Sequence, residues 1–378
     1  MSTACYFLRL QIVACLLGLI GFGVPRVLAE EPTTLKVFTD GGAYQLSQEN
    51  AFFKPFEKQT GTRIRSAAKE DGLSLLKKWQ EAAKADGDVI NLTSFEAEKA
   101  CELGLLRSFT EQDIAPGPKG EPIMQDFFPN SLMDCAVPNV AWAALMVVKP
   151  QKQKRKQARS WSDFFNVKKY PGKRSLKKSA RFTLELALLG AGVKAGDVYQ
   201  LLSTAEGQKK AFAQLDRLTD KIVWWDDSKG SLVAFKDPDV RMGLSFNGRL
   251  FHAIVADGLI ADLVWRGHIY DFDYWAIPLK TPNHVQALAF VKFATAPQRL
   301  ARQADWMPYG PMRASAQDFI KAHQIGKMPM KPYVPTAQTQ FRSALKFNEG
   351  WWRSETGQAV EEKFSAWLEG KLTWPKAE

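Results

Sequence analysis

Adjacent carboxylates are the side chains of this sequence that most readily suggest catalysis. Asp226 and Asp227 form a pair of the kind that glycosidases use, although sequence does not give their separation in the fold, and the preceding tryptophans indicate packing. The motifs GxSxG, HExxH and GxxxxGK[S/T] do not occur, and no cysteine is paired with a histidine. We therefore expect a binding protein with no catalytic residue and no cofactor; a secreted hydrolase and an envelope scaffold are the alternatives from other classes.

The elements that would position a binding site alternate between strand and helix over the first 70 residues after the amino-terminal segment. Hydrophobic periodicity predicts strands at 35–40, 62–66 and 88–92, and helices at 45–60, 73–85 and 95–103. This alternation is typical of a parallel sheet with crossover helices.

The middle of the chain repeats the α/β pattern. We expect strands at 140–148, 222–225 and 240–246, extended segments at 263–265 and 275–278, and helices at 161–165, 184–189, 198–202, 208–218, 286–294 and 298–304. Extended segments near 143–150 and 273–280 indicate a chain that leaves one lobe, builds a second and returns. The expected division is 30–143 for the first part of lobe 1, 144–276 for lobe 2, and 277–378 for the return to lobe 1 with the C-terminal helices. A ligand would lie in the cleft between the lobes, at the carboxyl ends of strands.

The amino terminus reads as an export signal. A short start with one arginine precedes an apolar run of about 15 residues, which is shorter than the roughly 20 residues of a spanning helix. Small and apolar residues then precede Glu30, so residues 1–29 are expected to be a cleavable signal peptide and the protein periplasmic. A retained anchor and a lipoprotein acylated at Cys15 are the alternatives.

Removal of this signal leaves two of the four cysteines and most of the positive charge. Cys101 and Cys135 remain, and an even number in an oxidising compartment predicts one disulfide, with two buried free thiols as the alternative. The four histidines form no close group with cysteine, so no metal site is expected.

The mature chain has 49 basic and 40 acidic residues, a net charge of +9. A basic run at 149–159 contains no aromatic residue, which favours a solvated loop over a nucleic-acid partner.

Several segments resemble the polyamine-type extracellular solute-binding proteins of ABC importers. They are DGGAY at 40–44, AFFKPFEKQTG at 51–61, WSDFFNVKKYPGKR at 161–174, FNGR at 246–249, DFDYWAIP at 271–278, YGP at 309–311 and PYVP at 332–335. The resemblance covers most of 35–370, and the segment 161–174 is its most specific part. It implies an α/β, bilobal type II periplasmic-binding fold with two crossing segments, and delivery of the ligand to a membrane permease by what we expect to be a monomer.

The resemblance also implies which residues bind the ligand. In the family, a cleft of aromatic and acidic side chains holds a cationic amine, because a desolvated ammonium needs anions and gains from aromatic faces. Its pattern points to Asp40 and Tyr44 on the first glycine-rich turn, to Glu96 after a strand, to Phe246 and Asn247 at a strand end, and to Asp273 on the returning segment. Each has a structural alternative: turn capping or packing, a helix-start carboxylate for Glu96, and a plain turn at the strand end. Trp265, Tyr270 and Trp275 are further candidates for the aromatic wall or the core.

Two arginines depart from a pure polyamine site. Arg249 follows Asn247-Gly248, and Arg181 lies on a loop that would face the cleft. A guanidinium recognises a carboxylate with two parallel hydrogen bonds, although it can equally neutralise a nearby aspartate. We expect a small amine-bearing solute, putrescine-like or spermidine-like, with a zwitterionic ω-amino acid such as 4-aminobutyrate or another carboxylate-bearing solute as the alternative.

Overall fold

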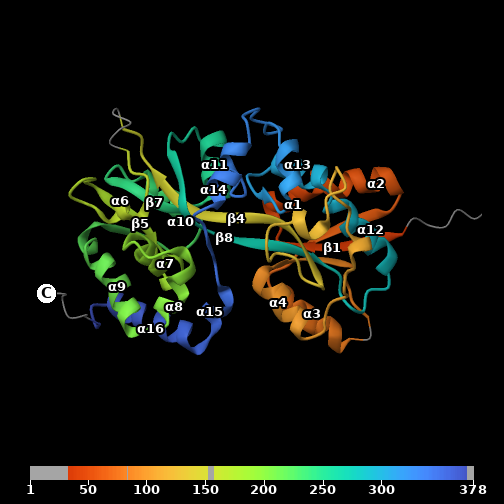
Figure 1. Cartoon of the computed structure of the whole chain (residues 1–378), viewed down its shortest axis with the longest axis horizontal. Helices are drawn as coiled ribbons and strands as arrows, with labels where there is room; N and C mark the ends of the chain where they lie inside the picture. Colours follow the sequence, from red (N-terminus) through yellow and green to blue (C-terminus); the bar gives the residue numbers. More distant parts are fainter. Residues whose placement is uncertain (1–32, 83, 152–156, 373–378) are drawn as a thin grey trace, which may run out of the picture. The chain divides into compact units, whose positions relative to one another are not determined.

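The computed structural model describes residues 33–82, 84–151 and 157–372, so the expected signal peptide lies outside the described residues. Within this part of the chain, one mixed sheet of ten strands runs in the order β2-β1-β3-β8-β4-β7-β5-β6, with β9 paired to β4 and β10 to β8 (Figure 1). The two expected α/β lobes are therefore joined by continuous hydrogen bonding through β8 and β4.

The first half of the sheet is parallel, as the alternation of strands and helices predicts. β1 (Thr34–Thr39) pairs in parallel with β2 (Arg63–Ala68) and β3 (Val89–Thr93). The connecting helices are α1 (Gly42–Gln48), a π-helical turn (Glu49–Phe53), α2 (Lys54–Thr60), α3 (Gly72–Glu81) and α4 (Ser94–Glu102). β3 is buried along most of its length, as expected for a strand covered on both faces.

Two long strands cross from the first half of the sheet to the second. β4 (Ala136–Val148) and β8 (Asp262–Ala276) pair in antiparallel fashion over most of their length. The sequence predicts two separate extended segments where β8 is one strand of 15 residues. The gap in the apolar pattern falls at Gly267, whose φ of 71° accompanies a register shift opposite Ala144, so an irregularity hides the continuity.

The second half of the sheet contains a strand that the pattern does not reveal. β5 (Lys173–Lys177) pairs in parallel with β6 (Ile222–Trp225) and β7 (Val240–Phe246). Arg174 makes β5 look polar, yet it is buried and its guanidinium donates to the backbone carbonyls of Tyr170, Gly172 and Phe164. The helices of this half are α6 (Trp161–Phe165), α7 (Ala180–Gly190), α8 (Val198–Leu202), α9 (Ala205–Asp216), α10 (Gly230–Lys236) and α11 (Asn247–Ala256).

The remaining elements divide between the two hydrophobic cores. α12 (His284–Ala294) and α13 (Pro297–Ala304) pack into the core of the first half. The C-terminal elements β10 (Leu345–Lys346), α15 (Glu349–Arg353) and α16 (Glu355–Leu368) contribute to the core of the second half. We therefore propose that lobe 2 includes 345–368 in addition to the middle of the chain. The short elements are α5 (Ile123–Asp126), β9 (Gly310–Pro311) and α14 (Gln338–Phe341).

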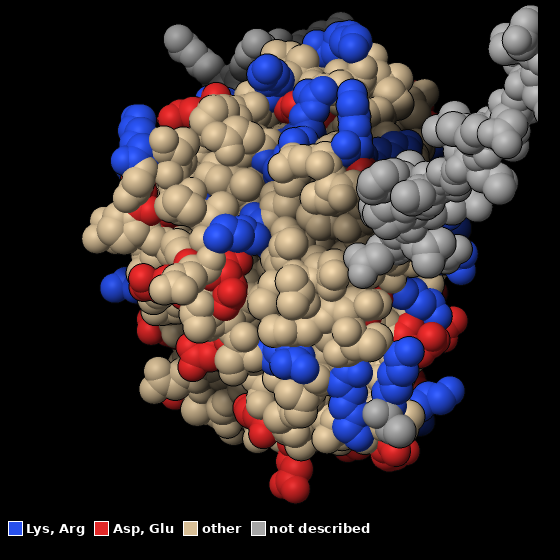
Figure 2. Space-filling view, turned by 90° about the vertical axis from the view of Figure 1, so that its right-hand side faces the viewer, with Lys and Arg blue, Asp and Glu red and all other residues tan. Residues whose placement is uncertain are grey.

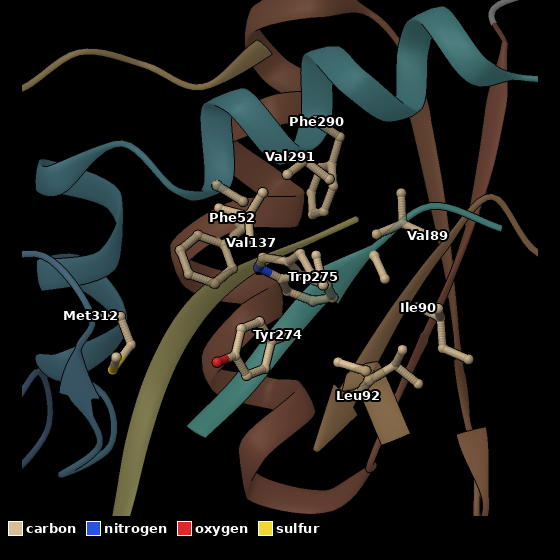
Figure 3. Packing of buried hydrophobic residues seen from close by; sticks show 14 of the residues in the cluster. Phe52, Val89, Ile90, Leu92, Val137, Tyr274, Trp275, Phe290, Val291 and Met312 are labelled. Carbon is tan, nitrogen blue, oxygen red and sulfur yellow. The ribbon is translucent and has the colours of Figure 1, made fainter. Parts of the chain in front are cut away.

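Aromatic and aliphatic side chains pack together in the first core (Figure 3). Trp275 is fully buried, with its ring 5.6 Å from that of Phe290 and 6.3 Å from that of Phe52. This candidate for the aromatic wall of a site is thus a core residue. Trp265 and Tyr270 also lie outside the cavity described below, where Trp265 donates to the carbonyl of Pro332 and Tyr270 packs 4.6 Å from Phe341.

A disulfide joins Cys101, near the end of α4, to Cys135, next to the start of β4. The Cα atoms are 5.9 Å apart, and the bridge closes a loop across 34 positions of sequence.

Among the described residues, no helix is both long enough and apolar enough to cross a membrane. Basic and acidic side chains both occur across the face seen in Figure 2, with uncharged surface between them.

Candidate ligand cleft

Residues from both halves of the sheet line a cavity of about 430 Å³, a size suited to a small molecule. The first half contributes Glu70, Asp71, Phe95 and Glu96. The second half contributes Trp142, Lys177, Arg181, Phe182 and Phe246. Asp271 of β8 and three residues of the C-terminal segment, Phe347, Glu349 and Arg353, also line the cavity.

One wall of the cavity is basic. Nη1 of Arg181, at the start of α7, donates to both carboxylate oxygens of Glu349 at 3.0 and 3.2 Å. Nε of Arg353, one turn along α15, donates to the same carboxylate at 2.7 Å. Lys177 lines this wall as well, where burial and then the charge of Arg181 lower its pKa. Two guanidinium groups therefore share the carboxylate of Glu349, and Lys177 adds a third basic side chain to this wall.

Aromatic rings form the side of the cavity next to this basic wall. Phe182 stacks on Phe347 at 4.5 Å with an angle of 7° between the rings, and it meets Phe246 edge-on at 5.5 Å. Trp142 lies 6.1 Å from Phe246. The backbone of Phe182 has a φ of 68°, a left-handed conformation that is costly for a bulky residue and that often marks ligand sites. The strain directs an aromatic ring into the lining at the start of α7.

The opposite wall is acidic. Glu96 lies in the first turn of α4, where it forms a capping box with Thr93 and accepts the backbone N–H of Gly72 at 2.6 Å. Asp271 is 2% exposed, and one of its oxygens accepts the hydroxyl of Ser94 at 2.6 Å. Burial raises the pKa of Asp271 to about 7. The capping alternative for Glu96 is thus present together with its place in the cavity lining.

Three of the predicted residues form a second acidic cluster that does not line the cavity. Gly41 and Gly42, both with positive φ, turn the chain after β1 and place Asp40 and Tyr44 at the carboxyl end of that strand. Burial raises the pKa of Asp273 well above its usual value, and the charge of Asp40 adds to this effect. Lys69 connects the cluster to the cavity, because its Nζ lies 2.6 Å from Asp40 and 3.8 Å from Glu96.

In the segment Phe246-Asn247-Gly248, the side chain of Asn247 has a structural role. Asn247 begins helix α11, which the sequence pattern reads only as a strand-end turn. Its side chain accepts the N–H of Ala143 at 3.0 Å and donates to the carbonyl of Pro308 at 2.6 Å, so it ties α11 to the crossing strand β4. Arg249 donates to the hydroxyl of Ser228 at 3.2 Å and does not line the cavity.

Sequence reasoning thus placed Glu96, Arg181 and Phe246 in the cavity and missed several of its partners. Asp271 carries a readable signal, because it precedes Asp273 by two residues and so lies on the same face of β8. Glu349 and Arg353 are four residues apart, the spacing of an ion pair on one helix face. Phe182 gives no such signal, since nothing in its sequence predicts a positive φ.

Comparisons with known proteins agree with this architecture. Residues 51–330 match the model of a family described as bacterial extracellular solute-binding protein. A gamma-aminobutyric acid-binding protein of Pseudomonas aeruginosa is 32% identical over 351 residues, which cover 93% of this chain and 95% of that protein. A solved ABC transporter substrate-binding protein from Bradyrhizobium japonicum gives a TM-score of 0.71 at 24% identity, covering 89% of this chain and 99% of the other. A GABA receptor structure gives 0.69 at 24% identity, covering 91% and 100%. The likeness to these structures confirms the expected type II periplasmic-binding fold.

Proposed function

Because this chain belongs to the bacterial extracellular solute-binding protein family, we propose that its cavity captures a small zwitterionic amino acid of the 4-aminobutyrate type. The coarser conclusion follows from the family itself: the chain is the substrate-binding component of an ABC importer and not an enzyme. The family also implies a periplasmic location and a permease as the partner that receives the ligand.

The observation that carries the proposal is the separation of charge across the cavity. Arg181 and Arg353 both donate to Glu349, so one carboxylate serves two guanidinium groups and donors remain on this wall for a ligand carboxylate. The facing wall presents Glu96 and Asp271, which suit an ammonium group. A linear molecule with one charge of each sign complements both walls, whereas a diamine would place a cation against the guanidinium groups.

The relative with the most extensive sequence likeness reported above supports the same class of ligand. That protein is a gamma-aminobutyric acid-binding protein, and it aligns with 93% of this chain. We propose that ligand binding favours closure of the cleft, because Glu96 belongs to the first half of the sheet and Arg181 to the second. A ligand that contacts both walls has a higher affinity for the closed form.

Thermal unfolding of the refolded, ligand-stripped protein tests this proposal. The panel contains 4-aminobutyrate, putrescine, spermidine, common amino acids, choline and organic acids. At about 100 times its dissociation constant, a true ligand adds about 2.7 kcal/mol to the free energy of unfolding and raises the midpoint. We expect the shift with 4-aminobutyrate or a near homologue. A shift with diamines alone would contradict the zwitterion proposal.

A polyamine is the second candidate, and the acidic cluster next to the cavity favours it. Asp40, Asp273 and Glu96 share Lys69 as their nearby base, and Asp273 is 5% exposed. If a diamine reached this cluster, an Asp273→Ala variant would bind putrescine more than tenfold more weakly. An unchanged dissociation constant for putrescine in that variant would remove Asp273 from the site.

A further inference from the structure

Asp271 is the buried acid of the cavity lining and has no ion pair within the described residues. It lies on β8 and lines the cavity, and in the sheet it stands opposite Trp142 of β4. Glu96, by contrast, already accepts the backbone N–H groups of Gly72 and Thr93 at 2.6 and 2.9 Å. Asp273 does not line the cavity.

Asp271 also lacks a basic partner. Within the described ranges, no lysine or arginine lies within ion-pair distance of its carboxylate, although Lys69 serves both Glu96 and Asp40. The ionisable groups around it are Glu98 of α4, Lys346 of β10, Tyr199 of α8, and Tyr270, Asp273 and Tyr274 of its own strand. Glu98 raises its pKa and Lys346 lowers it, but both effects are smaller than that of burial.

We propose that Asp271 is the residue that anchors the ligand's ammonium group, a role that rests on the proposed function. The buried carboxylate accepts the hydroxyl of Ser94 and is stabilised by the backbone N–H of Phe272, and with about four lone-pair sites it has further acceptor capacity for an ammonium group. The aromatic face of Trp142, which also lines the cavity, adds cation–π attraction to the same group. Arg181 on the opposite wall would then take the carboxylate end.

Proton release accompanies this mode of binding. Burial raises the pKa of Asp271 to about 7, so this carboxyl group binds a proton as the pH falls below neutral. An ammonium group stabilises the ionised carboxylate, and the proton leaves to solvent. Affinity therefore rises with pH and falls roughly tenfold for each unit below pH 7, while the ligand's own carboxyl stays ionised above about pH 5.

Isothermal titration of the wild-type protein with 4-aminobutyrate, in buffers of different ionisation enthalpy, counts the released protons. We expect the number of protons released per ligand to fall steadily from pH 6 through pH 7 to pH 8. A count near zero at all three values would overturn the proposal. This measurement needs no variant, so it decides the question even if substitutions at Asp271 prevent folding.

Asp271→Asn keeps the size of the side chain and its acceptor for Ser94 while removing the charge. We expect at least tenfold weaker binding of 4-aminobutyrate at pH 8 and no proton release at pH 6. Asp305→Asn is the matched control, because burial also raises the pKa of Asp305 and this residue does not line the cavity. It should release the same protons as wild type. Proton release lost in Asp305→Asn or in Asp273→Asn, but kept in Asp271→Asn, would contradict the assignment.

The same titrations separate this inference from the proposed function. If the wild type binds putrescine and not 4-aminobutyrate, the zwitterion proposal fails, and proton release on putrescine binding still decides the role of Asp271. If it binds neither amine, both proposals are wrong.

Discussion

At the scale of single residues, the cavity places Arg181 where a ligand carboxylate would compete with Glu349 for the guanidinium group. Only Nη1 of Arg181 is engaged with Glu349. Arg353 donates to the same carboxylate, so Glu349 would keep a basic partner after the ligand arrives. The sequence leaves open whether Arg181 neutralises a nearby acid or binds a ligand carboxylate. The two roles are compatible, since an arginine can neutralise a carboxylate and still offer donors to a ligand.

Replacing Arg181 tests this role. Arg181→Gln should weaken the binding of 4-aminobutyrate about ten- to a hundredfold, because a hydrogen bond to a charged group contributes about 1.5–3 kcal/mol. The dissociation constant from isothermal titration is the measurement. Arg217→Gln is the matched control, since Arg217 lies at the C-terminal end of α9 on the surface, donates to Gln214 and does not line the cavity. Equal affinity in Arg181→Gln and wild type would place the carboxylate elsewhere.

The role of a candidate site residue can be predicted from sequence where the sheet topology determines its position, but not where a partner distant in sequence engages its side chain. Glu96 follows the buried strand β3 and Phe246 is the last residue of β7, and their positions in the lining follow from the topology of an α/β sheet. Asn247 and Asp40 occupy similar positions, but the side chain of Asn247 donates to the carbonyl of Pro308, and that of Asp40 accepts a hydrogen bond from Lys69. Such long-range partners have no local sequence signal, so sequence alone could not distinguish the two outcomes.

At the scale of elements, helix α15 carries Glu349 and Arg353, and a buried acid holds it in place. Glu185 of α7 accepts Nε1 of Trp352 at 2.6 Å and the hydroxyl of Tyr199 at 3.1 Å. The same hydroxyl accepts the backbone N–H of Asn348 at 2.9 Å. The C-terminal segment thus belongs structurally to the cleft through contacts with α7 and α8, which its helical, tryptophan-rich sequence does not reveal.

This network should make stability depend on pH. Burial raises the pKa of Glu185 to about 7, above its unfolded value of about 4.5, so the folded state binds more protons between these values. The associated stability is present at low pH and lost as pH rises through 7. Relative to wild type, Glu185→Gln should gain about 2 kcal/mol in the free energy of unfolding between pH 5 and pH 8, measured by urea unfolding. A difference that does not change with pH would show that Glu185 titrates normally.

At the scale of the whole molecule, the alternation of strands and helices predicts the α/β class and the two crossing segments. The pairing of β4 with β8 into a single sheet was not predictable, because the irregularity near Gly267 divides β8 into two apparent segments. β5 was missed because Arg174, a buried base satisfied by backbone carbonyls, conceals its strand character. Both failures arise where tertiary contacts override a local pattern.

The disulfide acts at this scale, since it links the end of α4 to the crossing strand β4. The bridge closes a loop of 34 positions of sequence. Because it restricts the unfolded chain, it should add about 2–4 kcal/mol to the free energy of unfolding. The double variant Cys101→Ser, Cys135→Ser should lose that much free energy of unfolding in urea while binding ligand with unchanged affinity. If reducing agent leaves the midpoint of the wild-type protein unchanged, the bridge does not contribute to stability.

The central claim is that the cavity recognises both ends of a zwitterion. Isothermal titration of the ligand-stripped protein with 4-aminobutyrate, putrescine and butyrate tests it most directly, because these share a four-carbon chain and differ in their terminal groups. We predict saturable binding of 4-aminobutyrate, with putrescine and butyrate each at least a hundredfold weaker, since each leaves one charged wall without its partner. Equal or tighter binding of putrescine would contradict the account and would identify the acidic cluster around Asp273 as the centre of the site.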